Sequence, residues 1–147
     1  MKPWLKKIII TAVFIFIVAG AVIWYVFSAK FADTTGQKVD YTVDAIELIH
    51  EFQKNDRLAN TKYAEKMLVV KGTISQVEAA DTTVNIKFTD SLSGAYAIFA
   101  FQRQQMPIAK GLKEGDKVAI KGSCSGGTYS EILSTEYISF KRCVLSK

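Results

Sequence analysis

The two cysteines and the single histidine are the residues best suited to chemistry in this chain. Cys124 and Cys143 are its only cysteines, and His50 is its only histidine. Any Ser-His-Asp or Cys-His catalytic arrangement would therefore have to use His50. On a helical wheel His50 borders Ile46 at the edge of a polar face, so we interpret it as a half-exposed surface residue. The chain also lacks the GxxxxGK[ST], HExxH and GxSxG motifs.

Pairs of acidic residues are the remaining candidates for catalysis. Glu131 and Glu136, and likewise Asp81 and Asp90, could be considered as such pairs. Each lies in a predicted turn or at a predicted strand end, where solvated carboxylates are ordinary, so a glycosidase-like pair is disfavoured. The sequence therefore predicts no enzyme, no catalytic residue, no cofactor and no metal site.

Cys124 lies at the end of the fourth predicted strand, and Cys143 lies in the last one. In the predicted barrel the two side chains are close enough to meet. Outside the cytoplasm a disulfide is the natural interpretation. It would close a loop of about twenty residues and stabilise the fold by about 3 kcal/mol in the chain-entropy model. Two buried reduced thiols are the alternative. Metal ligation is disfavoured because two cysteines without a nearby histidine make an incomplete ligand set.

An uncharged, apolar segment at residues 8–27 predicts a membrane anchor. A helix needs about twenty such residues to cross the hydrocarbon of a bilayer. Trp4, Trp24 and Tyr25 lie where aromatic side chains prefer the two membrane interfaces. The bilayer is therefore the first predicted partner of this chain.

The lysines around this segment predict its orientation. Lys2, Lys6 and Lys7 precede it, and Lys30 stands alone just after it. The positive-inside rule then places the N-terminus in the cytoplasm and the C-terminal domain on the periplasmic, or extracytoplasmic, side of a cytoplasmic membrane.

A cleaved secretory signal is the competing interpretation. Residues 19–21 offer a small-x-small site, but cleavage there would leave the apolar residues 22–27 as a new N-terminus in water. The apolar run is also longer than the usual signal core of about 7 to 15 residues. We therefore favour a single-pass anchor.

A tether and a helix are expected before the sheet. Residues 31–40 are polar and contain Gly36, which predicts a flexible tether. Thr42 can cap a following helix, with Asp44 in its first turn. Residues 55–66 suit either a continuation of this helix or a turn. The apolar face of the helix expected after Thr42 is formed by Ala45, Ile46, Leu48, Ile49 and Phe52.

Five strands are expected in the remainder of the chain. Turn signals separate them at residues 80–81, 90–94, 112–116 and 126–127, and a short helix or loop with Pro107 is expected at residues 102–111. This order of strands is that of a five-stranded OB barrel. Gly72 would permit the sharp bend of the first strand, although it also suits an ordinary, weakened strand position. The predicted strands are residues 67–77, 84–89, 95–101, 117–123 and 136–144.

The predicted fold class is accordingly mainly β with helices. It comprises a transmembrane helix, an amphipathic helix and a five-stranded OB-type barrel. The predicted divisions are a cytoplasmic stub with the anchor at residues 1–30, the tether at 31–40 and the OB-like domain at 41–147.

The third predicted strand is apolar on both sides. Tyr96, Ile98 and Ala100 alternate with Phe99 and Phe101. In one interpretation one set fills the barrel and the predicted helix covers the other. In the alternative an exposed set forms a groove on which an oligonucleotide or oligosaccharide stacks. The candidate binding face then consists of Tyr96, Phe99, Phe101, Arg103, Lys87 and Lys121.

Four stretches carry a family resemblance: NDRLANTKYAEK at 55–66, LVVKGTI at 68–74, LKEGDKVAIKGSCSG at 112–126 and CVL at 143–145. In them the chain resembles the bacterial envelope proteins of the tRNA-anticodon-domain-like OB-fold family. The resemblance covers most of residues 40–145. It implies an OB barrel preceded by a helix, usually in an exported or membrane-attached protein. Such a fold does not by itself establish RNA binding.

Charge argues against a nucleic-acid partner. Of 19 Lys and Arg residues three precede the apolar segment, so the rest nearly balance the 14 Asp and Glu residues. Nucleic-acid modules need clustered basic residues. We therefore predict a non-catalytic binding or interaction module that contacts another envelope protein or a small ligand. The alternative, an oligonucleotide or oligosaccharide binder, predicts an exposed Phe99 or Tyr96 beside Lys and Arg.

Overall fold

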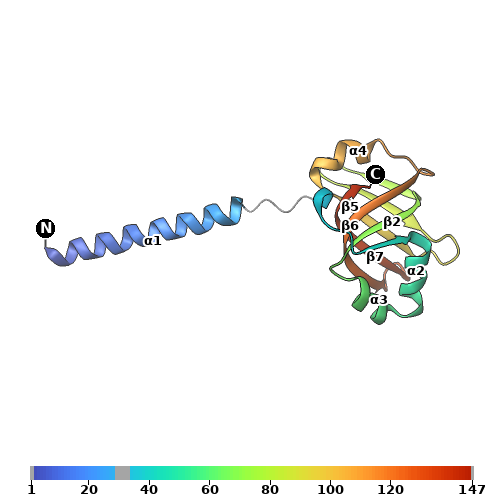
Figure 1. The fold of residues 1–147 in the computed structure, drawn as a ribbon, viewed down its shortest axis with the longest axis horizontal. Helices are drawn as coiled ribbons and strands as arrows, with labels where there is room; N and C mark the ends of the chain where they lie inside the picture. Colours follow the sequence, from blue (N-terminus) through green and yellow to red (C-terminus); the bar gives the residue numbers. More distant parts are fainter. Residues whose placement is uncertain (1, 29–33, 147) are drawn as a thin grey trace. The chain divides into compact units, whose positions relative to one another are not determined.

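The computed structural model describes residues 2–28 and 34–146. Contacts within the chain divide it into two units, Met1–Asp33 and Thr34–Lys147. Figure 1 shows the elements of each unit, which are treated separately below. Residues 31–33 of the predicted tether lie outside the described residues.

The first unit contains one helix, α1 (Pro3–Ser28), which includes the predicted span. Within residues 3–25, the most apolar stretch of 18 residues has a mean hydropathy of 2.6 and is not buried by other parts of the protein. Large apolar side chains are exposed all round it, for example Phe16 and Trp24. Because such a helix is stable only in apolar surroundings, its length and composition suit a membrane span or an N-terminal signal sequence.

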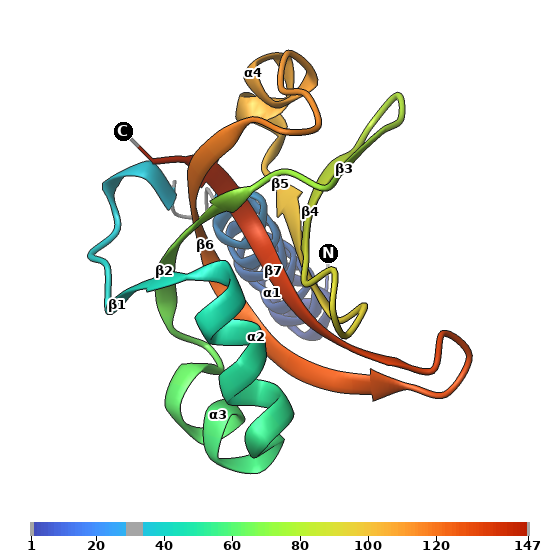
Figure 2. The same cartoon turned by 90° about the vertical axis from the view of Figure 1, so that its right-hand side faces the viewer.

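The second unit is built on one mixed sheet of seven strands (Figure 2). The order of strands across the sheet is β1-β2-β6-β7-β5-β4-β3. The pairs β1–β2 and β5–β7 are parallel, and the others are antiparallel. The strands are β1 (Tyr41–Asp44), β2 (Met67–Thr73), β3 (Gln76–Ala79), β4 (Val84–Thr89), β5 (Tyr96–Phe101), β6 (Lys117–Ser130) and β7 (Thr135–Leu145).

The prediction of a closed, five-stranded barrel is wrong. Within the described residues the two ends of the sheet do not pair, and β1 is an additional strand. The predicted first strand is divided because the backbone at Ile74 and Ser75 bonds in two directions. Ile74 N–H donates to the carbonyl of Asp116, whereas Ser75 N–H donates to that of Lys87. The chain therefore passes from β2 beside β6 to β3 beside β4, and the chain order remains OB-like.

Gly72 serves close packing in β2, and the break in the strand falls two residues after it. A Cβ at this position would lie 2.9 Å from Cβ of Ala45 and 2.9 Å from Cδ2 of Phe88. Both distances are too short for carbon atoms. The glycine therefore lets the start of α2 and the side chain of Phe88 meet on this strand.

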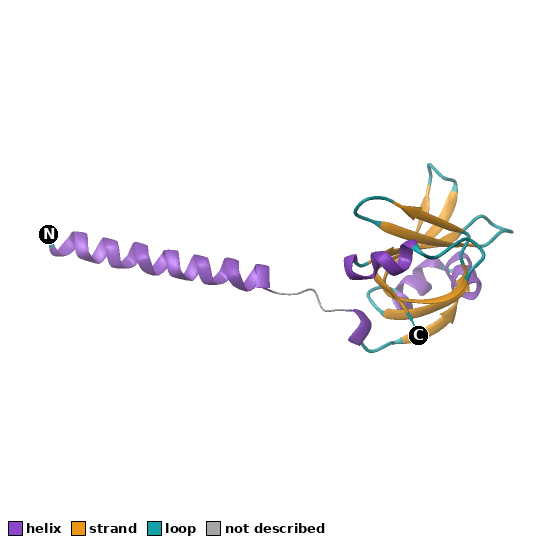
Figure 3. Cartoon of the chain, turned by 90° about the horizontal axis from the view of Figure 1, so that it is seen from above, coloured by secondary structure: helices purple, strands orange, loops and turns teal. Residues whose placement is uncertain are grey.

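The helices of the second unit are short (Figure 3). The predicted helix begins later than expected, because Thr42 lies in β1 and Asp44 is the N-cap, accepting the N–H of Ile46 at 2.9 Å. Asn55 caps a separate helix, accepting from Leu58 N–H at 3.1 Å, which resolves the ambiguity at residues 55–66. The helices are η1 (Thr34–Gly36), α2 (Ala45–Lys54), α3 (Asp56–Tyr63), η2 (Arg103–Gln105) and α4 (Met106–Lys110).

The core lies between the inner side of the sheet and α2. Three aromatic rings form its centre: Phe99 stacks on Phe140, with ring centroids 4.6 Å apart, and tilts against Phe88 at 4.9 Å. Leu48, Ile49 and Phe52 of α2 join the same cluster. The helix thus covers the inner side of β5, and the prediction that it covers the second side of this strand is wrong.

The glycines at 126 and 127 lie inside β6 and not in the predicted turn, which occurs at residues 131–134. A Cβ at Gly127 would lie 2.5 Å from Cδ1 of Phe52. The side chain of Asn60 also donates to the carbonyl of Gly127 at 3.0 Å and accepts its N–H at 2.9 Å. These glycines therefore form the surface on which α2 and α3 dock.

Part of the predicted tether contacts the sheet. Thr34 is fully buried. Met67 N–H donates to the carboxylate of Asp40 at 2.8 Å, and Asp40 N–H donates to the carbonyl of Met67 at 2.7 Å. Residues 34–40 thus belong to the folded second unit.

Candidate functional site

The outer side of β4, β5 and β7 is an uncovered surface with a regular pattern. In β4 and β5, core side chains alternate with partly or fully exposed ones, as expected where one side of a sheet is buried. We call this surface the tyrosine face. Its residues are Asn85, Lys87, Thr89, Tyr96, Ile98, Tyr137 and Ser139.

Two stacked tyrosines form the centre of this face. The parallel register of β5 and β7 sets Tyr96 opposite Tyr137, with ring centroids 5.7 Å apart and an interplanar angle of 14°. Nζ of Lys87 lies 5.1 Å from the centroid of the Tyr96 ring, a cation–π distance. Lys87 also pairs with Glu78 at 2.6 Å. The face therefore offers two flat rings, phenolic hydroxyls and a cation that already has a carboxylate partner.

The structure divides the predicted binding residues among four places. Tyr96 and Lys87 lie together on the tyrosine face. Phe99 and Phe101 are buried in the core, so their assignment to an exposed face is corrected. They point inward because side chains alternate along β5 and the inner side faces α2. Arg103 is an exposed residue of η2.

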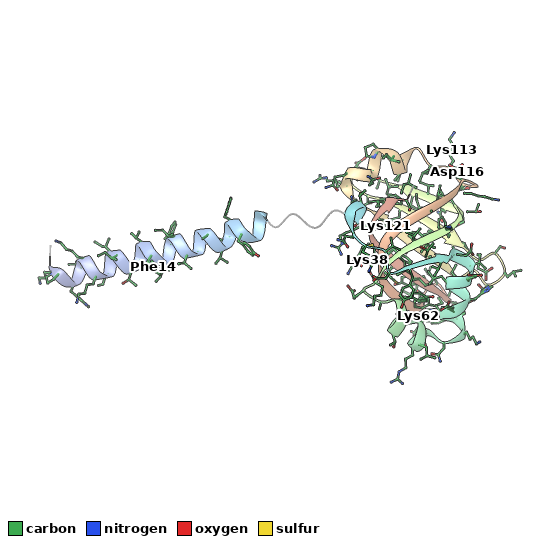
Figure 4. All side chains as sticks on the ribbon, in the orientation of Figure 1. Phe14, Lys38, Lys62, Lys113, Asp116 and Lys121 are labelled. Carbon is green, nitrogen blue, oxygen red and sulfur yellow. The ribbon has the colours of Figure 1, made fainter. Side chains whose placement is uncertain are left out.

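Lys121 is also separate from the tyrosine face. It is only 8% exposed, and its ammonium group donates to the carbonyls of Thr35 and Gln37. Figure 4 places its side chain beside the segment that follows η1.

Tyr137 is the aromatic residue of the face that the sequence interpretation missed. In the last strand it alternates with the buried Ile138 and Phe140, so period-two alternation could have identified it. Its pairing with Tyr96 requires the parallel β5–β7 contact, which joins strands far apart in the sequence. The sequence therefore contains a signal for the exposure of Tyr137 but none for its pairing with Tyr96.

Exposed apolar side chains lie on the loops that end these strands. Figure 2 shows that the β6–β7 and β3–β4 hairpins extend beyond the body of the domain. Tyr129 is 60% exposed and Ile132 is 95% exposed on the β6–β7 hairpin, and Leu92 in the β4–β5 turn is 93% exposed. In OB folds the loops that correspond to the β3–β4 and β6–β7 hairpins border the ligand face.

His50 contacts Asp90, but the arrangement is not that of a nucleophile and base. His50 Nε2 lies 3.3 Å from Oδ2 of the buried Asp90, and Ser93 Oγ donates to the same oxygen at 2.7 Å. The carboxylate stands between them, so Ser93 does not donate to the imidazole. Hydrogen bonds from Ser93 and from Leu92 N–H hold the pKa of Asp90 below its usual value, with a smaller contribution from His50. These contacts order the β4–β5 turn.

The two cysteines are free thiols in the structure, so the predicted disulfide is not supported. Burial raises the pKa of Cys124 to about 11, although the N–H of Gly126 partly opposes this. Burial also raises the pKa of Cys143, partly opposed by the N–H of Ala100. Both thiols are therefore protonated and unreactive at neutral pH. Residues 2–28 and 34–146 contain no cluster of three metal-ligating side chains.

The chain order, the open seven-stranded sheet and the packed helix define an OB-like domain. The model of the family described as tRNA_anti-like matches residues 1–136. The chain belongs to this family, which confirms the resemblance seen in its sequence.

The chain is similar to several solved structures, and the first one described here shares its fold. A protein from Klebsiella pneumoniae, described as a candidate nucleic acid-binding lipoprotein, aligns with a TM-score of 0.57 at 15% identity, over 76% of this chain and 100% of that one. An OBody bound to hen egg-white lysozyme aligns with a TM-score of 0.44 at 18% identity, over 57% of this chain and 84% of that one. A candidate aspartyl-tRNA synthetase from Leishmania major aligns with a TM-score of 0.47 at 9% identity, over 80% of this chain but only 22% of that one. A comparison with curated proteins finds no match.

Proposed function

We propose that this protein is a non-catalytic, membrane-anchored binding module whose tyrosine face holds an extended oligomer, the rings of which pack on the tyrosine side chains. The helix α1 would anchor it in the cytoplasmic membrane. Lys2, Lys6 and Lys7, which precede its apolar residues 8–27, favour an orientation with the OB-like unit on the non-cytoplasmic side.

The observation that carries this proposal is the stacked pair Tyr96–Tyr137 on the uncovered side of the sheet. Tyrosines on an outer sheet surface remain partly in water, whereas the rings of Phe88, Phe99 and Phe140 already fill the core. Half-exposed, pre-aligned rings lose little conformational entropy when a ligand ring packs on them. OB domains use this part of the sheet to bind oligonucleotides and oligosaccharides.

The charges around the face favour an oligosaccharide. Lys87 is paired with Glu78 at 2.6 Å, and Lys141 on β7 is paired with Glu65 at 3.3 Å. A cation that already has a carboxylate partner contributes less free energy to the binding of a phosphate, because the existing ion pair must be broken or shared. The polar side chains of Asn85, Thr89 and Ser139 can instead hydrogen-bond to sugar hydroxyls.

Single-stranded nucleic acid is the second candidate ligand. The Klebsiella pneumoniae protein of the same fold is described as a candidate nucleic acid-binding lipoprotein. The cation near the Tyr96 ring would also suit a base stacked beside a phosphate.

Calorimetric titration of the full-length chain in lipid nanodiscs tests the proposal. Oligosaccharides of envelope polymers and single-stranded oligonucleotides serve as the ligands, and the variant Tyr137→Ala is compared with Tyr41→Ala. Tyr41 is a matched control, because it also pairs with a tyrosine, at 5.3 Å, and has a lysine over its ring. Tyr137→Phe keeps the ring and tests its hydroxyl.

We expect Tyr137→Ala to weaken binding of the active ligand by about 5- to 150-fold, as one lost stacking contact of roughly 1–3 kcal/mol implies. Tyr41→Ala should bind like the wild type. Salt separates the two ligand classes, since log K falls with log[salt] by about 0.7 for each phosphate contact and not at all for a neutral sugar. Equal binding by Tyr137→Ala and the wild type would refute the tyrosine face as the site.

The anchor has its own test. Intact mass of the protein purified from membranes distinguishes the full chain from one cut after residues 19–21. Recovery of the full mass in the membrane fraction supports the anchor, and a shortened soluble chain contradicts it.

A further inference from the structure

A second site lies on another part of the domain. A cavity of about 740 Å³ is lined mainly by Val39, Ile108, Val144 and Leu145, with Gln105 and Lys121 among its polar residues. Its walls come from η1 and the segment after it, from η2 and α4, and from β6 and the C-terminal end of β7. Figures 2 and 3 both show the C-terminal end of β7 close to η1. None of these residues belongs to the tyrosine face.

The cavity has a cation at one side. The Lys121 ammonium carries three N–H donors and uses two on the carbonyls of Thr35 and Gln37. Lys121 is only 8% exposed, yet no carboxylate among the described residues pairs with it. Buried charges are normally paired, so this ammonium group suits an anion that enters the cavity.

Two groups that are close in sequence to lining residues also lack hydrogen-bond partners. Oγ1 of Thr34 and Nε of Arg142 are buried and unpartnered in the part of the chain that the structure describes. Thr34 precedes a lining residue directly, and Arg142 lies two residues before Val144. Arg142 also has a φ of 52°, a left-handed conformation that a side chain other than glycine rarely adopts. Strained and unsatisfied groups concentrate at binding sites.

The rest of the wall is apolar and partly open to water. Ile108 on α4 is 51% exposed, and Leu145 is partly exposed. A free inorganic anion would leave these side chains wet. A ligand with an anionic head and a hydrocarbon tail would satisfy Lys121 and cover them together.

We propose that this cavity holds one anionic phospholipid, with its phosphate at Lys121 and an acyl chain along Ile108, Val144 and Leu145. The inference rests on the proposed role of α1 as a membrane span. Only five residues separate Ser28, the last residue of α1, from Thr34. A stretch of this length spans roughly 20 Å at most, which limits how far Thr35, a residue of the cavity wall, can lie from the end of α1.

Native mass spectrometry of the full-length chain in detergent micelles tests the site. The chain is titrated with phosphatidylglycerol, with phosphatidylcholine as the zwitterionic comparison, and with glycerol phosphate as a head without a tail. Ile108→Asp places a repelling charge on the apolar wall at an exposed position, where the fold tolerates it. Leu58→Asp is the matched control, because Leu58 is 66% exposed on α3 and lines a different hollow. Lys121→Met tests the cation.

We expect the wild type and Leu58→Asp to retain one phosphatidylglycerol at least tenfold more tightly than Ile108→Asp does. Lys121→Met should lose the preference for phosphatidylglycerol over phosphatidylcholine, and glycerol phosphate should not compete. Equal retention by Ile108→Asp and Leu58→Asp would show lipid bound only around α1 and would overturn the proposal. Competition by glycerol phosphate would overturn the assigned tail.

The same samples separate this inference from the proposed function. Oligomer binding at the tyrosine face should be unchanged in Ile108→Asp, because the two sites share no residue. Loss of lipid binding with intact oligomer binding would identify Ile108 with the lipid site alone. Loss of both in a variant whose circular dichroism matches the wild type would refute the separation of the two sites.

Discussion

Gly127 provides a quantitative test of how the helices dock on the sheet. The variant Gly127→Ala would place a Cβ 2.5 Å from Cδ1 and 2.8 Å from Cε1 of Phe52. Gly127 is not among the residues with positive φ, so its backbone admits alanine and the contact with Phe52 is the obstacle. Favourable carbon contacts lie at about 3.5–4.0 Å, so the ring must move by roughly 1 Å.

The expected cost follows from two opposing effects. Overpacking of this kind costs about 1–3 kcal/mol. Replacing glycine by alanine returns about 0.4–1 kcal/mol by restricting the unfolded chain. The net loss in the free energy of unfolding should therefore be about 1–2 kcal/mol.

A double-mutant cycle with Phe52→Leu isolates the contact. The shorter leucine side chain leaves room for the new methyl group, so Gly127→Ala should cost less than about 0.5 kcal/mol in that background. Urea unfolding of the full chain in micelles, followed by circular dichroism, measures each variant. Gly36→Ala is the control, because nothing lies within 4 Å of the added Cβ. An equal cost of Gly127→Ala in both backgrounds would refute the docking argument.

Three further predictions concern the thiols, the β4–β5 turn and the start of α2. Because Cys124 and Cys143 are buried with raised pKa values, a maleimide should label neither in the native protein, and should label both after unfolding without reductant; labelling that needs reductant would reveal a disulfide instead. The pKa of Asp90 is lower in the folded state, so its contribution to the free energy of unfolding is complete above about pH 4 and is lost as the pH falls further. Asp90→Asn should therefore flatten the dependence of the free energy of unfolding on pH below about pH 4. An unchanged dependence would contradict this role. Asp44→Ala removes the cap of α2 and should lower the free energy of unfolding by about 1 kcal/mol. Urea unfolding of this variant beside Asp44→Asn, which retains a capping side chain, measures the difference.

Local patterns were sufficient where a residue's role depends on its neighbours in sequence. The apolar run at residues 8–27 predicts the long helix α1, because twenty apolar residues without a charge have few other stable arrangements. Alternation in residues 84–89 matches β4, with Val84, Ile86 and Phe88 all buried. The connection at residues 102–111 indeed forms η2 and α4.

Local patterns misled where the same residue type serves two purposes. Two consecutive glycines usually mark a turn, but residues 126 and 127 are glycines because α2 and α3 approach β6 closely there. Phe99 and Tyr96 are both aromatic residues of one apolar strand. Only the placement of α2 on the inner side determines that Phe99 is buried and Tyr96 remains partly exposed.

The sequence by itself therefore determined the apolar N-terminal helix, the family and most of the strands, since period and composition act over a few neighbouring residues. The tertiary structure decided the break at Ile74 and Ser75, the pairing of Tyr96 with Tyr137 and the burial of Lys121. Each of these depends on contacts between segments far apart in the chain: Asp116 and Lys87 at the break, β7 beside β5, and the residues after η1 over β6. Such contacts are chosen by the packing of the whole domain, and no local pattern of residues records them.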